Sequence, residues 1–360
     1  MFGLAFSIAS SIPSVPHARD RSRIQESVVD AYIEVGLLVD AAHCAQQIDG
    51  WRRGESLAHI GQRYLDLGDR EKAREFATRA LDVARAEDEW RRERVTMEAA
   101  RIYMLLGDHA RVEQLTKDGS QAELAAIATD RTTLLPSDQL DLQADTFDRA
   151  IATKNFDIAR SAIDGYVVWL GRVVDDETRR ERALVALDQA LPGLPADLQV
   201  TNRLRIAEVL STSDRPDLAG AQIARADEIV AQTKFLPEDV ASVNAKVALA
   251  HAGMGETDSA RATLHLLLSQ HAQRRIEIVD LRRAASLRSL AEAFAEIGDT
   301  AAMLDCYALA LDEGALNPNA RPRAEDLCAT CVSIGRVGIT PPPALLERIR
   351  SIQSSLTDPW

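Results

Sequence analysis

Residues 55–85, ESLAHIGQRYLDLGDREKAREFATRALDVAR, contain two apolar helix faces and the turn between them. In the first part, apolar or small residues recur at three- and four-residue steps, which places them on one helix face. These residues are Leu57, Ile60, Gly61, Tyr64 and Leu65. The second part repeats the pattern with Ala73, Phe76, Ala77, Ala80 and Leu81. Between them, Gly68 can end one helix in the left-handed conformation and Asp69 can cap the next. The stretch therefore predicts one helix–turn–helix hairpin.

Imperfect copies of this hairpin fill most of the chain. One copy places Ala100, Tyr103 and Gly107 at a constant offset of 39 residues from Gly61, Tyr64 and Gly68. Other copies share the turn more than the faces. Structural turn glycines are expected at Gly36, Gly68, Gly107, Gly255 and Gly298, and further turns at Lys154-Asn155, Asp214 and Gly335.

The small residue, the tyrosine, the turn glycine and the two alanines of residues 55–85 resemble the tetratricopeptide repeat. The resemblance covers most of residues 22–356, strongly in three units and loosely elsewhere. It implies an all-α fold, a right-handed superhelical α-solenoid of antiparallel helix hairpins, in which each hairpin buries its face on the next. The repeat length is irregular, because the expected turns depart from that family's period of roughly 34 residues.

We expect five segments along the chain: a disordered leader or signal remnant at 1–21, N-terminal repeats at 22–118, degenerate repeats or a joint at 119–194, C-terminal repeats at 195–340, and a capping helix and tail at 341–360. In the central segment, a helix is expected at 120–129 without a clear turn partner. The leader is apolar from Phe2 to Ile12 but lacks the basic region of a secretory signal. We expect a cytoplasmic protein, or an exported one if the leader is a truncated signal.

Composition agrees with a helical chain that does not bind nucleic acid. Hydrophobic residues make up 46% and aromatic residues only 4% of the sequence, and short β-branched runs bounded by turn residues are scarce. The net charge of −13 opposes a general affinity for phosphate backbones. No apolar run approaches the roughly 20 residues that span a membrane. The four scattered cysteines fit a reducing compartment.

A Trp-Arg-Arg sequence precedes two of the turn glycines at the same distance. It begins at Trp51 and Trp90, and Leu281 begins a Leu-Arg-Arg copy. One interpretation is structural: the large side chain packs on the neighbouring hairpin while the arginines reach nearby acids. The other is functional, since guanidinium groups one repeat apart can bind anions in bidentate fashion. The arginines concerned are Arg52, Arg53, Arg91, Arg92, Arg282 and Arg283.

The resemblance also implies a concave groove lined by the first helix of each hairpin. The lining positions it implies in this sequence are Gln62, Leu65, Arg101, Met104, Arg288 and Glu292. This mixture of polar and apolar side chains suits a peptide segment. The members of the family that clamp a terminal carboxylate use lysine and asparagine on these faces. The corresponding positions here do not provide them, so we do not expect that clamp.

Nothing in the sequence predicts a catalytic, metal or cofactor site. Cys328 and Cys331 have the spacing of half a zinc site, but a structural zinc usually needs four ligands, and no second pair lies nearby. Their positions correspond to Gly61 and Tyr64, so we expect both in the core. His251 occupies a tyrosine position, for which packing is the expected role.

We therefore expect a non-enzymatic scaffold that binds another protein or a peptide segment. The alternative is a regulatory or sensor module that recognises a small anionic or peptide signal through the repeated arginines. An enzyme with a site assembled from distant residues is a third possibility. The sequence predicts no partner by name and no oligomeric state.

Overall fold

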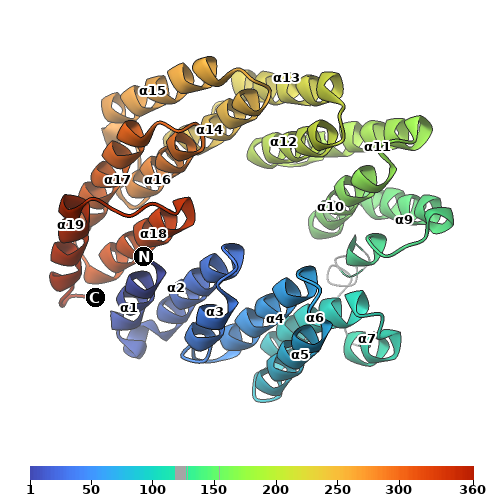
Figure 1. The fold of residues 1–360 in the computed structure, drawn as a ribbon, viewed down its shortest axis with the longest axis horizontal. Coiled ribbons are helices and arrows are strands. Elements are labelled where there is room, and N and C mark those ends of the chain that lie inside the picture. Colours follow the sequence, from blue (N-terminus) through green and yellow to red (C-terminus); the bar gives the residue numbers. More distant parts are fainter. Residues whose placement is uncertain (118–126, 128, 154) are drawn as a thin grey trace. The chain divides into compact units, whose positions relative to one another are not determined.

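The computed structural model describes residues 1–117, 127, 129–153 and 155–360, and over these residues it is helical without strands (Figure 1). The first helices are α1 (Phe2–Ser11), α2 (Ser14–Glu34), α3 (Leu38–Ala45), α4 (Trp51–Asp66), α5 (Arg70–Ala84), α6 (Glu89–Leu105) and α7 (His109–Thr116). They are followed by η1 (Ser137–Gln139), α9 (Leu140–Ala152), α10 (Phe156–Val173), α11 (Glu177–Ala190), η2 (Leu191–Gly193), α12 (Ala196–Thr212) and α13 (Pro216–Gln232). The last are α14 (Pro237–Gly253), α15 (Thr257–Gln273), η3 (Arg275–Glu277), α16 (Asp280–Glu296), α17 (Thr300–Ala315), α18 (Ala320–Val337) and α19 (Pro343–Ser354). The all-α class predicted from the sequence is confirmed.

The chain divides into two compact units, which are described separately. Unit 1 contains Met1–Val95, Leu236–Leu249 and Thr257–Trp360. Unit 2 contains Thr96–Phe235 and Ala250–Glu256.

Consecutive helices pack together in pairs. The most extensive pairs are α4 with α5 and α16 with α17 in unit 1, and α12 with α13 in unit 2. Between α4 and α5, the side chains of Ile60, Ala73, Ala77 and Ala80 are fully buried. Alanine at three of these positions leaves room for the two helices to approach closely. This pairwise packing is consistent with a helical repeat.

The turn glycines have the backbone that the sequence pattern requires. Gly36, Gly68, Gly107, Gly255 and Gly298 all have positive φ angles, from 74° to 94°. A side chain is strained in this region, whereas glycine adopts it freely. At the expected turn without glycine, Asp214 has a φ of 58°, a conformation that Asp and Asn tolerate better than other residues with side chains.

Aspartates cap the helices that follow three of these glycines. The side chain of Asp69 accepts a hydrogen bond from the backbone N–H of Lys72 at 3.0 Å. Asp108 and Asp299 make the equivalent contacts at 3.1 and 3.2 Å. Each satisfies a donor that the first helical turn otherwise leaves unpaired. In each Gly-Asp pair, the glycine thus ends one helix and the aspartate caps the start of the next.

The last expected turn lies three residues later than the sequence indicated. α18 continues through Gly335 to Val337 and ends at Gly338, which has a φ of 76°. Gly335 lies inside the helix, where a Cβ would be 2.6 Å from a ring carbon of Phe2. The sequence suggested a turn because nothing near Gly335 in the sequence indicates its close contact with Phe2, which lies far away in the chain.

The N-terminal segment is helical where the sequence suggested a disordered leader. α1 packs on α18 and α2 within unit 1 (Figure 1). Ala5, Ile8, Ala9 and Ile12 have no exposed surface. Phe2 lies 5.0 Å from the ring of Tyr32, measured between centroids. The apolar residues that resembled the end of a secretory signal are therefore core residues of unit 1 in this structure.

Ion pairs surround the contact of α1 and α2 with α18. Arg336 of α18 pairs with Glu34 of α2 at 3.0 Å, and Arg321 pairs with Asp20 at 3.1 Å. The last helix, α19, packs on α17 and α18 through Leu345, Ile349 and Ile352. Apolar packing thus forms the centre of this part of unit 1, and charged side chains form its edge.

Unit 2 has a core built around three aromatic side chains. Tyr166 and Trp169 of α10 are fully buried and lie edge to face, with ring centroids 5.9 Å apart. Trp169 donates a hydrogen bond from Nε1 to the Leu140 carbonyl at 2.9 Å. Phe147 of α9 lies against Gly165, where a Cβ would be 2.4 Å from its ring. This close contact holds α9 against α10.

Two expectations fall partly or wholly outside the described residues. The helix expected at 120–129 is described only at 127 and 129, and the turn expected at Lys154-Asn155 is described only from Asn155, which caps α10. Within the described helices, none is long and apolar enough to cross a membrane.

Candidate interaction surface

The groove positions implied by the resemblance belong to both units. Gln62 and Leu65 lie on α4 and Arg288 and Glu292 lie on α16, all in unit 1. Arg101 and Met104 lie on α6 in unit 2. Met104 is buried, with 9% of its surface exposed, and so does not offer a contact surface. Gln62 donates a hydrogen bond to Asp66 at 2.9 Å, and Leu65 is half-buried.

The two groove arginines are held by acids of the same chain. Arg101 binds Asp130 in bidentate fashion, from Nε at 2.6 Å and from Nη2 at 3.2 Å. This bonding raises the pKa of Arg101 above its usual range. Arg288 donates to Asp326 at 3.1 Å, and its side chain is only 14% exposed. Both arginines therefore stabilise helix contacts and offer little free charge to a ligand.

Glu292 borders an open hollow between α16 and α18. The hollow has a volume of about 390 Å³ and is lined by Glu292, Ala295, Glu296, Arg336 and Val337. Ser333 donates a hydrogen bond to Glu292 at 2.6 Å, and the hydroxyl of Tyr307 contacts Ser333 at 2.9 Å. These contacts fix the carboxylate, while Glu296 remains exposed. The sequence identified Glu292 but missed its four neighbours, although Glu296 lies one helical turn later on the same face.

Most of the repeated arginines bond to other residues of the same chain. Arg52 of α4 forms an ion pair with Glu26 of α2, and Arg91 pairs with Asp88 at 3.2 Å. Arg92 donates to the Glu87 carbonyl at 2.8 Å. Arg283 donates to Asp280 at 2.7 Å and to the Arg275 carbonyl at 2.9 Å. Arg53 and Arg282 form no ion pair within the described residues.

The two tryptophans of the Trp-Arg-Arg copies lie together. The ring centroids of Trp51 and Trp90 are 5.5 Å apart, in an edge-to-face arrangement. The guanidinium of Arg52 lies 4.5 Å from the centroid of Trp51, and that of Arg91 lies 5.1 Å from Trp90. Such contacts add to packing between neighbouring helices. They fit the structural interpretation, in which this motif joins successive repeats.

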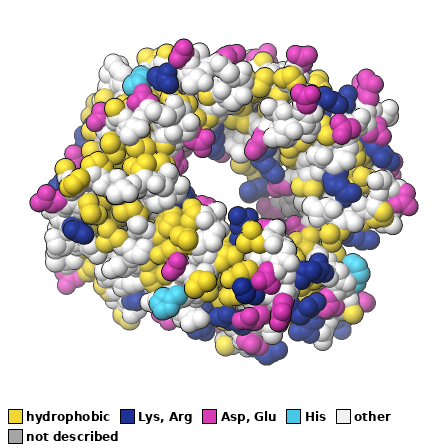
Figure 2. Space-filling model, viewed as in Figure 1, with side chains coloured by type: hydrophobic (Ala, Val, Ile, Leu, Met, Phe, Trp, Pro, Cys, Tyr) yellow, Lys and Arg dark blue, Asp and Glu magenta, His cyan; other side chains and the backbone are white. Residues whose placement is uncertain are grey.

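Charges of both signs are mixed on the face of the molecule in Figure 2. Basic and acidic side chains alternate there without a large area of one sign. Nucleic acids usually require a continuous basic surface. The distribution on this face gives no support for such a partner.

The cysteines are buried thiols. All four are free, and Cys306, Cys328 and Cys331 have no exposed surface. Burial raises the pKa of Cys331 to about 12, which disfavours the thiolate that metals and electrophiles need. In the described part of the chain, no group of three or more His, Cys, Asp or Glu side chains is placed to hold a metal ion.

His251 makes polar contacts where packing was expected. Its Nε2 lies 2.9 Å from Asp227 and its Nδ1 lies 3.0 Å from Glu256. Its side chain is 30% exposed. The imidazole ring has two nitrogens, Nδ1 and Nε2, that point in different directions. The side chain can therefore occupy the tyrosine position of a repeat and still bond to two carboxylates. The sequence gives no signal for Asp227, which lies on the preceding helix α13.

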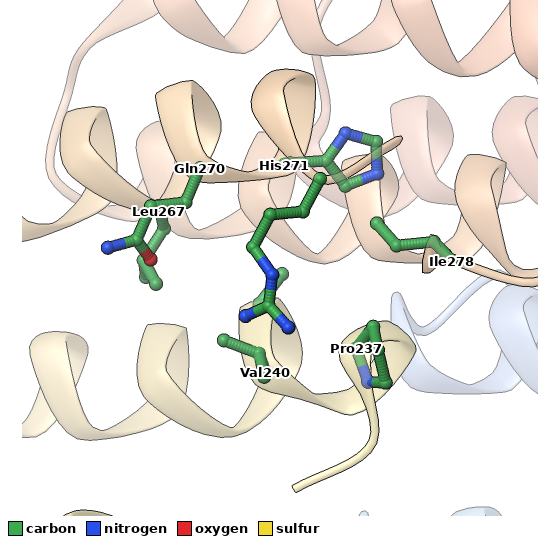
Figure 3. Close-up of a pocket in the computed structure, with 8 residues that line it drawn as sticks. Pro237, Val240, Leu267, Gln270, His271 and Ile278 are labelled. Carbon is green, nitrogen blue, oxygen red and sulfur yellow. The ribbon is translucent and has the colours of Figure 1, made fainter. Parts of the chain in front are cut away.

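A small cavity lies between α14 and α15 (Figure 3). His271 and Ile278 are on one side of it, Leu267 and Gln270 are on the other, and Val240 and Pro237 lie below. Nε2 of His271 is buried and has no hydrogen-bond partner. Burial lowers the pKa of His271, and the nearby carboxylate of Glu313 partly opposes this effect. The cavity has a volume of about 20 Å³, which is enough for one water molecule. A water there could form a hydrogen bond with this unpaired nitrogen.

The fold and these contacts define the class of the protein as an all-α protein of paired helices that pack as a helical repeat. No protein-family model matches the chain, and no curated protein sequence matches it. The resemblance to tetratricopeptide repeats therefore rests on the residues of the hairpins and on the packing of the helices.

Proposed function

We propose that this protein is a non-enzymatic scaffold, a tetratricopeptide-like array with a right-handed superhelix that binds a peptide or protein segment. The observation that carries the proposal is the open hollow between α16 and α18, which has both polar and apolar walls. A reducing, cytoplasmic location belongs to the same proposal, supported by four unpaired cysteines.

The walls of the hollow have the chemistry that a peptide segment needs. Ala295 and Val337 offer small apolar contacts, and Glu292 is already held in place by Ser333. A side chain that is fixed before binding loses less conformational entropy when a partner arrives. Glu296 is exposed and contributes a charge that can select the partner.

Affinity capture with three baits tests the scaffold function. The baits are the unchanged chain, Glu296→Lys in the hollow, and Glu347→Lys on α19 as a control with the same charge change at another exposed helix position. We expect a specific protein to be recovered from the lysate of the source cells with the unchanged chain and the control, and to be lost with Glu296→Lys. Equal recovery by all three baits would exclude the hollow, and recovery of nothing by any bait would count against a scaffold.

The alternative function, a sensor of small anions, depends on arginines that are accessible. Arg53, Arg92 and Arg282 are the members of the six without an ion pair in the described residues. Arg92 and Arg282 are the exposed ones of these three, so they are where such a ligand would bind. Thermal shift measurements with phosphate, sulfate and small dicarboxylates test this alternative. A ligand at 100 times its dissociation constant would stabilise the fold by about 2.7 kcal/mol. No shift with any of them leaves the scaffold as the better proposal.

A further inference from the structure

Two glutamates from different helices lie buried beside the first tryptophan of the Trp-Arg-Arg copies. Glu26 of α2 is 7% exposed and Glu55 of α4 is 4% exposed, and both belong to unit 1. Arg52 donates a hydrogen bond to one oxygen of Glu26, and Arg94 donates one to an oxygen of Glu55. Each carboxyl group therefore has one arginine partner and a second oxygen to satisfy.

The second oxygen of Glu26 has no donor nearby. Its Oε1 is shielded from solvent and has no hydrogen-bond partner when both carboxyl groups are ionised. Glu55 lies one helical turn after Arg52 on α4, and Arg52 binds Glu26, so the two buried carboxyl groups are neighbours that can form a hydrogen bond with each other. Two carboxylates are both acceptors, so such a bond exists only when one of them carries a proton. A proton on Glu26 Oε1 both satisfies this oxygen and provides the donor.

We propose that Glu26 and Glu55 share one proton and form a pH-sensitive joint between α2 and α4, which loosens when the proton is lost in mildly alkaline solution. With the proton, one negative charge and one hydrogen bond lie between two arginines. Without it, two buried carboxylates face each other, and their repulsion acts directly on the packing of α2 against α4.

The surrounding charges agree with this arrangement. Burial and the neighbouring Glu55 raise the pKa of Glu26 to about 8, and Arg52 opposes the rise. α1, α3, α4 and α18 pack against α2. α4 supplies both Glu55 and Arg52, while α1 has no charged side chain. The titratable side chains of α3 are Asp40 and His43. On α18, Arg321, Glu325 and Arg336 pair with Asp20, Arg23 and Glu34, and Asp326 pairs with Arg288.

The sign of the pH effect follows from the raised pKa. The unfolded glutamate has a pKa near 4.5, so between about pH 4.5 and pH 8 the folded chain holds a proton that the unfolded chain has released. The stabilisation is fully present below pH 4.5 and is lost as the pH rises toward and through 8. Linkage between these two values predicts a rise of roughly 30-fold in the unfolding equilibrium constant between pH 6.5 and pH 9.

Urea unfolding of the full chain at pH 6.5 and pH 9 tests the proposal. Glu26→Gln keeps the size of the side chain and a hydrogen-bond donor but cannot lose a proton. Between pH 6.5 and pH 9, its unfolding equilibrium constant should therefore rise about 30-fold less than that of the unchanged chain. Glu71→Gln, an exposed glutamate on α5, is the matched control and should follow the unchanged chain. Equal pH dependence in all three proteins would overturn the proposal.

Three further measurements keep the test decisive if Glu26→Gln does not fold. Glu55→Gln removes the same pair from the other side and should also reduce the pH dependence. Infrared spectroscopy of the unchanged chain should show a protonated carboxyl band at pH 6.5 that disappears by pH 9. The absence of that band would contradict a shared proton, whatever the variants do. Trp51 fluorescence should follow the same transition, because Arg52 and Arg94 both lie against its ring, 4.5 and 5.3 Å from the centroid.

Discussion

The ring of Phe2 fills the space that a side chain at Gly335 would need. A Cβ on Gly335 would lie 2.6 Å from one ring carbon and 2.9 Å from two others. Gly335 is inside α18 and Phe2 begins α1, so this contact joins the first and the penultimate helix of unit 1. The absence of a side chain at one position thus determines how closely the two helices approach.

Gly335→Ala should destabilise the protein by about 1–3 kcal/mol, because the new methyl group overlaps the ring. In a Phe2→Ala background the same change should become stabilising by about 0.5–1 kcal/mol, since alanine favours a helix more than glycine does. The reversal of sign is measured by urea unfolding of the four proteins of a double-mutant cycle. Additive effects in the cycle would show that the two residues are not in contact.

Gly165→Ala should also destabilise the protein by about 1–3 kcal/mol. A Cβ there would lie 2.4 Å from the ring of Phe147, which is buried and has little room to move. Gly171→Ala on the same helix is the control, because its nearest neighbour would be an ordinary 3.7 Å contact with Val209. That change should be neutral or stabilising by up to about 1 kcal/mol. Chemical unfolding decides, and similar losses for both variants would rule out the steric explanation.

Asp69→Ala should cost about 0.5–2 kcal/mol through the loss of the cap of α5. Its carboxylate accepts a hydrogen bond from the backbone N–H of Lys72. Asp69→Asn retains an acceptor oxygen at the same place and should lose far less. Thermal unfolding compares the two variants. If asparagine proved as harmful as alanine, the charge of Asp69 rather than its cap would be the source of the stability.

His271→Gln should weaken the dependence of stability on acidic pH. Burial lowers the pKa of His271 from 6.5, so as the pH falls below about 6.5 the unfolded chain binds a proton that the folded chain does not. The folded state therefore loses stability on acidification, even though the nearby Glu313 partly opposes the shift. Unfolding at pH 7.5 and pH 5.5 measures the slope. His43→Gln, on an exposed position of α3, should leave the slope unchanged, and an unchanged slope in His271→Gln would contradict the prediction.

The local features of the fold could be predicted from the sequence because short-range chemistry determines them. A glycine with positive φ followed by a capping aspartate is visible as Gly68-Asp69 and again as Gly298-Asp299. The faces of α4 and α5 follow from helical periodicity alone. Both signals act within a few residues, so one sequence is enough to read them.

Contacts between residues far apart in the chain could not be predicted in the same way. The apolar N-terminus was compatible with a disordered leader, because nothing near Phe2 indicates that α18 will cover it. Gly335 resembled a turn glycine for the same reason. Arg101 and Arg288 were expected to face a ligand, but Asp130 and Asp326 come from other parts of the chain. A single sequence shows that a charge is present, and only the fold shows which acid neutralises it.

The packing of α1 on α18 has a consequence for synthesis on the ribosome. Cys328 of α18 donates a hydrogen bond to the Ala5 carbonyl, and these residues are 323 positions apart. Helical repeats otherwise fold through neighbours, so most of the protein can form while the chain emerges. The contact of α1 with α18 must instead wait until α18 has been synthesised, on the order of 15 to 65 s later at about 5–20 residues per second. During that interval its apolar face is a ready target for chaperones, and the nascent protein should depend on them more than an ordinary repeat array does.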